Sequence, residues 1–588
     1  MKFYVLGSFY LILFTPLLAF WGDDYFVQYK TYLPFLMASI TLFVIGYRHT
    51  KIVVQDSDYI AIGITFLLFL SSLLNDRVVI NFPHLLGNFL FVLIWILIRK
   101  YHFPSLSNNI TIAIIIMIWV HIFVAIYGWW FNKLQNTNSV FNTYLLGISH
   151  NPSVISCYLV TFLPIIMHQA QSHRLKKVSI LTILFIVFVV VFNKSRVCVL
   201  GIVAMFLFFY YSELKKAKLL HNAIKYTIIA TILLLSLYSL LDNTKKTSSE
   251  GKLLALKISS KIGLDNLWQG TGYRSFPSEY MMYQSRYFQE GGSNREAWLA
   301  NNKYVADSEL VLFWVELGTP IFCSILLIIL YLVYQEYLKN KAFETPLIRS
   351  WGAWVAVLMV LLPLSNVLHF PETVNAIFVS SLFYGINVQK PIRIVIVLRR
   401  ETHKFMKIVI CSISVLSFLF YTLIIYDLSI WKKRVETASL QENYNVDDIK
   451  HILTHNGAFL HTNAAIFKSK GNYNEAYSYI KKTNKIQVGN MTMLLEAQIL
   501  NGLNRKKDAY QKYKDAVYAV PIQVLPKYYL MKTCEEWEDT TQAVSWARAI
   551  LQTPIKVESN QRSFFNKQAS DFIEKYTIND STKIFHLF

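Results

Sequence analysis

Cysteine is scarce in this sequence, and its placement excludes the common cysteine-based frameworks. Only five cysteines occur in 588 residues. Four fall inside apolar runs, and the fifth stands alone in a polar stretch; they are Cys157, Cys198, Cys323, Cys411 and Cys534. Neither the closely spaced even set of a disulfide-stapled domain nor the paired spacing of a zinc site is present.

Charged side chains are scarce as well, at 16% of the residues, whereas 54% are hydrophobic and the mean hydropathy is +0.37. A soluble domain is rarely so apolar over this length, and repeated apolar runs of about 18 or more residues are typical of membrane spans. Acidic residues are outnumbered, 36 against 57 Lys and Arg, which gives a net charge of +21. The basic residues gather in short loops between apolar runs, which indicates membrane orientation rather than a nucleic-acid partner. The composition predicts an all-α polytopic membrane protein that contacts lipid.

About thirteen apolar segments approach the roughly 20 residues that a membrane span needs. The first follows a basic N-terminus, and no small-residue cleavage site comes after it, so we expect a retained span rather than a signal peptide. The predicted spans lie near 3–20, 31–48, 59–75, 79–98, 109–131, 152–170, 178–193, 197–211, 223–241, 308–337, 350–369, 373–389 and 406–430.

The orientation of these spans follows from alternate basic loops. Positive charges cluster near 48–51, 99–100, 174–177, 215–218, 339–349 and 393–407, while the intervening short loops carry few. The positive-inside rule then predicts a cytoplasmic N-terminus. An odd number of spans places the long loop 242–307 and the C-terminal tail on the outer side. We therefore expect a transmembrane domain over 1–431.

The tail, 432–588, is polar and predicted to be soluble and helical. Ala476, Ala509 and Ala543 recur at spacings of 33 and 34 residues, and Pro521 and Pro554 are 33 apart. A period of about 34 residues is typical of tetratricopeptide repeats. About three degenerate units fit, and such a stack usually offers a concave surface to a protein partner. The alternative is a folding cap without a partner.

Two polar segments on the predicted outer side precede the long loop. In "LLGISHNPSVISCYL" (145–159), His150 stands just before Pro152, which suits a first helical position. His150 is a candidate base or phosphate donor, or else an incidental residue of the turn. In "FNKSRVCVLGIVAMF" (192–206), Arg196 separates two apolar runs. Its guanidinium suits pyrophosphate, and the alternative is an arginine that snorkels to lipid headgroups.

The long loop itself combines glycines, tyrosines and arginines in "GTGYRSFPSEYMMYQSRYFQEGGSNREAW" (270–298). Arg274 and Arg286 suit phosphate groups, and Tyr280 has the flat face and hydrogen-bonding edge that suit a sugar ring. The glycine spacing does not match a dinucleotide or P-loop fingerprint. A solvated amphipathic helix over 277–290 is the alternative interpretation.

Acidic residues mark the point where the chain re-enters the membrane, in "YVADSELVLFWVELGTP" (304–320). Asp307 and Glu309 flank the helix entrance, and Glu316 lies inside an apolar run, where ionisable groups are costly. Glu309 and Glu316 are seven residues apart and share a helix face, so Glu316 is expected to pair with another span. His369 lies in the hairpin segment "LSNVLHFPETVNAIF" (364–378), which is interpreted as an ordinary loop.

Taken in this order, these segments resemble the O-antigen ligase superfamily, which includes O-antigen ligases, pilin-type O-oligosaccharyltransferases and, more distantly, O-antigen polymerases. The likeness covers about 140–390. "GISHNPSVISCYL" resembles its Gly-x-x-x-Asn-Pro-Asn turn, and "NKSRVCVLG" resembles its Ser-Arg-x-x-x-Leu-Gly helix start. "GTGYRSFPSEYMMYQ" resembles its Gly-x-Gly-x-x-x-Phe segment, and "VADSELVLFWVELGTP" resembles its Ala-His-Asn-Glu/Asp and Glu-x-Gly segment.

The resemblance implies a GT-C type membrane bundle in the bacterial inner membrane, with the repeat tail in the periplasm as in some family members. It implies transfer of a glycan from undecaprenyl pyrophosphate to a hydroxyl of the lipid A core or of a protein Ser or Thr. No metal, nucleotide sugar or other cofactor is expected. Arg196 and Arg274 become the expected pyrophosphate contacts.

The chain departs from the family at one position that matters. Asp307 stands where the family usually has His, and Ser308 stands in place of Asn. Asp307 can act as the base, orient a base supplied by His150 or His369, or only cap the helix. Asp307, Glu309 and His150 are therefore the candidate catalytic residues.

Three other functions stay open at this point. A polysaccharide polymerase would join two lipid-linked repeats by the same chemistry. A lipid-linked glycan transporter would need polar residues along a path through the spans, whereas these spans are mostly Ile, Leu, Val and Phe. A membrane scaffold without catalysis would account for the missing His.

Overall fold

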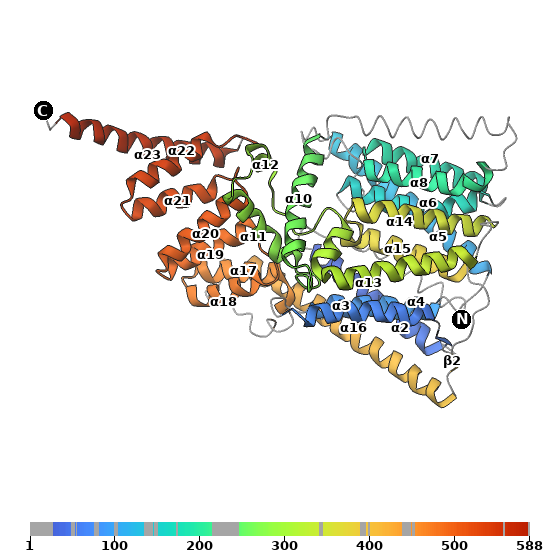
Figure 1. Ribbon diagram of the computed structural model, residues 1–588. Helices are drawn as coiled ribbons and strands as arrows, with labels where there is room; N and C mark the ends of the chain where they lie inside the picture. Colours follow the sequence, from blue (N-terminus) through green and yellow to red (C-terminus); the bar gives the residue numbers. More distant parts are fainter. Residues whose placement is uncertain are drawn as a thin grey trace.

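A computed structural model describes residues 27–48, 53–54, 56–75, 81–98, 104–134, 145, 151–171, 175–214, 246–339, 345–387, 396–397, 400–437, 449, 453–556 and 559–585. These residues are almost entirely helical (Figure 1). The helices of the first part are α2 (Val27–Arg48), α3 (Asp56–Leu73), α4 (Phe82–Ile98), α5 (Pro104–Leu134), α6 (Pro152–Ala170), α7 (Lys176–Phe192), α8 (Arg196–Leu214), α13 (Glu309–Lys339), α14 (Pro346–Leu364), α15 (Pro371–Asn387) and α16 (Arg400–Thr437).

These helices form a bundle that fits a membrane protein. Five of them contain segments long and apolar enough to cross a membrane: Asn108–Phe131, Pro152–Ala170, Glu309–Tyr331, Pro346–Leu364 and Lys404–Glu436. Eleven of the predicted spans coincide with a helix, while 3–20 and 223–241 lie outside the described residues. Helix α6 lies at the centre, packed against α5, α7, α14 and α15. It is buried on nearly all sides because it is apolar all round.

The two ends of the bundle differ in character. At one end, the two-residue strands β1 (Val53–Val54) and β2 (Ile396–Val397) pair antiparallel, with Val53 opposite Val397. This pair joins two loops whose basic residues predict the same side of the membrane. At the other end lie the helices of the long loop, α10 (Lys246–Asp265), α11 (Phe276–Gln289) and α12 (Asn294–Leu299), followed by the tail (Figure 1). Helix α10 runs across the bundle helices rather than along them.

The tail contains three consecutive helix pairs and a last long helix. The pairs are α17 (Gly457–Ser469) with α18 (Tyr473–Asn484), α19 (Asn490–Gly502) with α20 (Lys506–Ala519), and α21 (Leu525–Glu536) with α22 (Thr540–Gln552); α23 (Asn560–Phe585) follows. Ala476, Ala509 and Ala543 occupy the second helix of each pair and are fully buried. Pro521 and Pro554 come two residues after the second and third pairs end. The periodic residues thus mark close helix packing and helix ends.

The tail packs directly on the long loop, with α11 lying against α20. The Gln284 side chain donates to the Ala519 carbonyl at 2.5 Å, and the Ser285 hydroxyl donates to the Asp515 carbonyl at 2.9 Å. Buried residues of α10, α11 and α13 share one hydrophobic cluster with those of α19, α20 and α21. One surface of the repeat tail is therefore occupied by this chain's own loop.

Candidate functional site

The candidate site is built around a break in α13. The helix is interrupted at Gly318, where φ is 74° and ψ is 163°, a region that is almost restricted to glycine. The break leaves the Val315 and Glu316 carbonyls and the Thr319 N–H without partners inside the helix. Such backbone groups are tolerated at membrane depth only where other protein groups satisfy them.

The long loop supplies those partners through residues 270–272, here called the GTG turn. The Thr271 N–H donates to the Val315 carbonyl at 2.9 Å, and the Gly272 N–H donates to the Glu316 carbonyl at 2.8 Å. The Thr319 N–H donates to the Leu267 carbonyl at 2.8 Å. A Cβ added to Gly270 would lie 2.4 Å from the backbone of α13, and a Cβ added to Gly318 would lie 2.6 Å from the backbone of the loop. Neither position has room for a side chain. The sequence segments "GTG" and "VELGTP" are therefore two halves of one joint.

Helices α3 and α4 hold this joint from the other side. The Ser71 hydroxyl donates to the Glu316 carbonyl at 3.3 Å, and the Asn75 amide donates to the Gly270 carbonyl at 3.2 Å. From α4, the Asn88 amide donates to the Tyr273 hydroxyl at 3.0 Å. These contributions are not predictable from the sequence, because an isolated Ser or Asn in an apolar helix has no local signature of its distant partner.

Arg274 follows the GTG turn by two residues and has an unusual backbone conformation. Its φ is 66°, in the left-handed region that few residues other than glycine adopt. The buried carboxylate of Glu316 accepts from the backbone N–H groups of Arg274 and Phe276, the latter at 3.3 Å. Glu316 therefore pairs with the loop, not with another span as predicted. It fixes the backbone that presents Arg274.

Two histidines lie near the Arg274 side chain. Its guanidinium is close enough for its charge to act on Tyr273, His84 and His369. His84 is buried in α4, with its Nδ1 2.6 Å from the Asn81 Oδ1. Its Nε2 is also buried and has no hydrogen-bond partner among the described residues. His84 was not recognised in the sequence, since a lone His in an apolar helix is usually a core residue.

Glu309 holds the backbone at His369 in place. The buried Glu309 carboxylate accepts from the backbone N–H groups of Leu368, at 2.5 Å, and His369, and the Glu309 N–H donates to the Ser365 carbonyl at 3.2 Å. The His369 side chain stays partly exposed to solvent. Two effects lower the pKa of His369. The larger is partial removal of the ring from water by the surrounding protein, and the smaller is the positive charge of Arg274. The ring is therefore neutral at pH 7.

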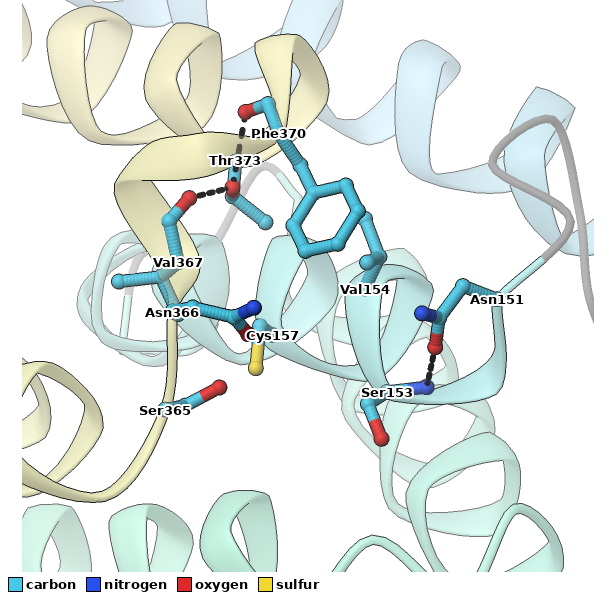
Figure 2. Close-up of a pocket in the computed structure, with 9 residues that line it drawn as sticks. All are labelled: Asn151, Ser153, Val154, Cys157, Ser365, Asn366, Val367, Phe370 and Thr373. Atoms are coloured by element: carbon cyan, nitrogen blue, oxygen red, sulfur yellow. Dashed lines mark hydrogen bonds between the residues drawn. The ribbon is translucent and has the colours of Figure 1, made fainter. Parts of the chain in front are cut away.

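A small pocket lies between the same hairpin and the start of α6 (Figure 2). At its rim the Asn151 side chain caps α6 by accepting from the Ser153 N–H at 2.9 Å. Opposite, the Thr373 hydroxyl donates to the Phe370 carbonyl at 3.0 Å. Two segments that are distant in the sequence, 151–157 and 365–373, thus face each other. The lining residues are Asn151, Ser153, Val154, Cys157, Ser365, Asn366, Val367, Phe370 and Thr373.

Arg196 begins α8 at the same end of the bundle. Its guanidinium donates to the Ser249 hydroxyl at 3.1 Å, which ties α8 to the start of α10. The predicted base His150 lies outside the described residues. Nearby, the buried Asn193 side chain accepts from the Leu145 N–H at 2.8 Å and donates to its carbonyl at 2.9 Å. Asn193 anchors the approach to α6, a role that only the folded chain reveals.

Asp307 lies two residues before the start of α13. It forms an ion pair with Lys303, four residues earlier. The Ser308 hydroxyl accepts from the Val311 N–H at 3.4 Å, so Ser308, and not Asp307, caps α13. The capping interpretation of Asp307 is therefore wrong.

The two remaining predicted substrate contacts lie on α11. Arg286 is exposed, with its guanidinium 5.3 Å from the centre of the Tyr283 ring. Tyr280 is 1% exposed and lies beside Phe276, with ring centres 5.3 Å apart. Tyr280 belongs to the hydrophobic core shared with the tail, which favours a packing role.

No protein-family model, curated protein or solved structure matches this chain. Within the described part of the chain, no group of three or more His, Cys, Asp or Glu side chains is arranged to hold a metal ion.

Proposed function

We propose that this protein is a glycosyltransferase of the O-antigen ligase type. It moves a glycan from undecaprenyl pyrophosphate to an acceptor hydroxyl at the periplasmic face of the bacterial inner membrane. The observation that carries the proposal is the placement of Arg274. A glycine joint and a buried carboxylate fix the backbone at Arg274, and the charge of its guanidinium acts on the solvent-exposed imidazole of His369, at the end of the bundle that carries the long loop.

The chemistry requires little from the protein beyond positioning. The acceptor oxygen attacks the anomeric carbon of the donor sugar, the bond from that carbon to the phosphate oxygen breaks, and undecaprenyl pyrophosphate leaves. Arg274 neutralises charge that develops on the phosphate oxygens. Because the backbone N–H groups of Arg274 and Phe276 both donate to Glu316, the backbone from which the Arg274 side chain projects is fixed before the substrate binds.

His369 takes the acceptor proton in this proposal. A general base must be deprotonated at working pH and within reach of the hydroxyl, and His369 is neutral and partly exposed. The His84 Nε2 has no hydrogen-bond partner among the described residues, from either side chain or backbone, but that atom is buried and a substrate cannot touch it without local rearrangement. Glu309 then acts as a positioning residue, because its carboxylate already accepts two backbone N–H groups of the hairpin.

The polymerase alternative uses the same steps with a lipid-linked glycan as the acceptor. The packing of the tail on the loop that carries Arg274 supports a ligase or a protein glycosylase, since it brings a repeat surface beside the site. The bundle core supports an enzyme over a transporter: the buried face of α6 is mostly Val, Ile, Leu and Phe.

A transfer assay tests the proposal with the purified full chain, a lipid-pyrophosphate glycan, and three acceptors: lipid A core, a Ser/Thr peptide and a second lipid-linked glycan. Arg274→Ala is expected to lower transfer by about 100- to 1,000-fold, the usual effect of removing one group that stabilises developing charge. Arg286→Ala, on the same loop but exposed, is the matched control. Equal transfer by the two variants contradicts the role of Arg274.

The same assay separates the candidate bases. His369→Ala is expected to lose most of the transfer activity, whereas Asp307→Ala is expected to keep it because Asp307 is paired with Lys303. Full activity of His369→Ala combined with loss in Asp307→Ala would return the catalytic role to the position where the family has His. Activity with none of the acceptors contradicts the proposed function itself.

A further inference from the structure

Two cysteines from different helices meet at the end of the bundle that carries the long loop. Cys157 lies in the second turn of α6, and Cys198 lies in the first turn of α8. Their Sγ atoms are 3.3 Å apart, although the residues are 41 positions apart in the sequence. Both side chains are at least 98% buried. Of the five cysteines, the structure brings these two into contact.

The contact distance is close to that of a bonded pair. A disulfide has its sulfurs about 2 Å apart, so closing this pair requires a movement of about 1.3 Å. The Cys157 sulfur also faces the pocket between α6 and the 365–373 hairpin, as Figure 2 shows. Of the pair, Cys157 is therefore the one that borders this pocket.

We propose that Cys157 and Cys198 form a disulfide bond in the mature protein. The proposal rests on the outward orientation of this end of the bundle, which belongs to the proposed function, because disulfides form and persist outside the reducing cytosol. It does not depend on glycan transfer. The bond joins the start of α6, which borders the pocket, to the start of α8, which carries Arg196.

The oxidant is a disulfide-bonded thiol oxidoreductase of the same compartment. The Cys157 thiolate attacks one sulfur of that disulfide, which forms a mixed disulfide and releases the other oxidoreductase sulfur as a thiolate. The Cys198 thiolate then attacks the Cys157 sulfur and displaces the oxidoreductase. Two thiols of this chain lose two protons and two electrons, and the oxidoreductase disulfide gains them as two thiols.

A two-step labelling experiment on the full chain tests the bond. Cells are lysed in N-ethylmaleimide, the protein is purified and denatured without reductant in the same reagent, and it is then reduced and labelled with iodoacetamide. Peptide mass spectrometry is expected to find iodoacetamide on Cys157 and Cys198, and N-ethylmaleimide on the other three cysteines. All five carrying N-ethylmaleimide overturns the proposal, as does the second label on a different pair.

Variants make the assignment specific. Cys157→Ser is expected to expose Cys198 to N-ethylmaleimide in the first step, and Cys198→Ser to expose Cys157. Cys323→Ser, which removes an exposed cysteine, leaves the pair protected. Reductant is expected to lower the thermal midpoint of the wild type and of Cys323→Ser, but not of the other two variants. A protected pair in a protein that transfers no glycan overturns the proposed function alone.

Discussion

The joint between α13 and the GTG turn predicts a large effect from the smallest possible substitution, Gly318→Ala. The added Cβ lies 2.6 Å from the Gly270 nitrogen and from the Trp268 carbonyl oxygen. The backbone conformation at Gly318 costs a side-chain-bearing residue about 1–3 kcal/mol. If the loop moves away, three backbone hydrogen bonds across the joint are lost, at about 0.5–1.5 kcal/mol each. Together the joint loses about 3–7 kcal/mol.

Hydrogen exchange at the Thr271 and Gly272 amides measures this loss without reference to any activity. Both amides donate across the joint, so their exchange reports its opening. A loss of about 3 kcal/mol corresponds to exchange more than about 100-fold faster. Gly291→Ala is the matched control, since Gly291 also has a positive φ of 106° but has no atom within 4 Å of its added Cβ.

The comparison of the two variants decides the outcome. Gly291→Ala is expected to leave both amides protected, because its strain is local to the turn between α11 and α12. Exchange in Gly318→Ala within about threefold of that control, a difference under about 1 kcal/mol, would refute the reasoning that the loop closes the break in α13.

Four further outcomes follow from individual contacts. Gln284→Ala, which removes the buried bond to the Ala519 carbonyl, is expected to lower the thermal midpoint and to speed proteolysis of the tail, because an unsatisfied buried carbonyl costs about 1–3 kcal/mol. Asn193→Ala removes bonds to three backbone groups, the Leu145 N–H, the Leu145 carbonyl and the Pro152 carbonyl, and is expected to lower the midpoint further than Gln284→Ala, which removes bonds to two backbone carbonyls, in the same calorimetric scan. Burial opposes ionisation of Glu296, but hydrogen bonds from its neighbours outweigh burial and lower its pKa from 4.5 to about 2. The stabilisation from ionised Glu296 is therefore complete above about pH 4.5 and is lost as the pH falls toward 2. Glu296→Gln is expected to remove this pH dependence from an acid-unfolding curve. Because the pKa of His369 is lowered from 6.5, the unfolded chain binds the proton first, so stability falls as pH drops below 6.5, and His369→Ala is expected to lack that component of an acid titration.

Local patterns in the sequence were sufficient to predict most helices of the fold. Apolar runs and basic loops placed eleven segments that are helical in the structure, and the alanine period anticipated the paired helices of the tail. Each of these features depends on the composition or the repeat of residues that are close together in the sequence. The number of membrane crossings and their direction stay predictions.

The site was only partly predictable, because its decisive contacts join distant segments. The glycines of the GTG turn and the "VELGTP" segment are both distinctive in the sequence, yet nothing local indicates that they bind each other. Asn75 and Asn88 contact the long loop across 195 and 185 residues, and Cys157 meets Cys198 across 41. The sequence excluded a disulfide framework by spacing, whereas the fold decides which thiols become neighbours.

The hydrophobic cluster shared by the long loop and the tail has a consequence for biosynthesis. The loop, 246–307, is synthesised well before α20, which ends at Ala519 and completes its support. At about 5–20 residues per second, that interval lasts about 10–40 s. During this time Arg274 has no finished scaffold behind its loop. A nascent chain therefore leaves this loop without its packing partner until the tail is made, and chains truncated before α20 never acquire that partner.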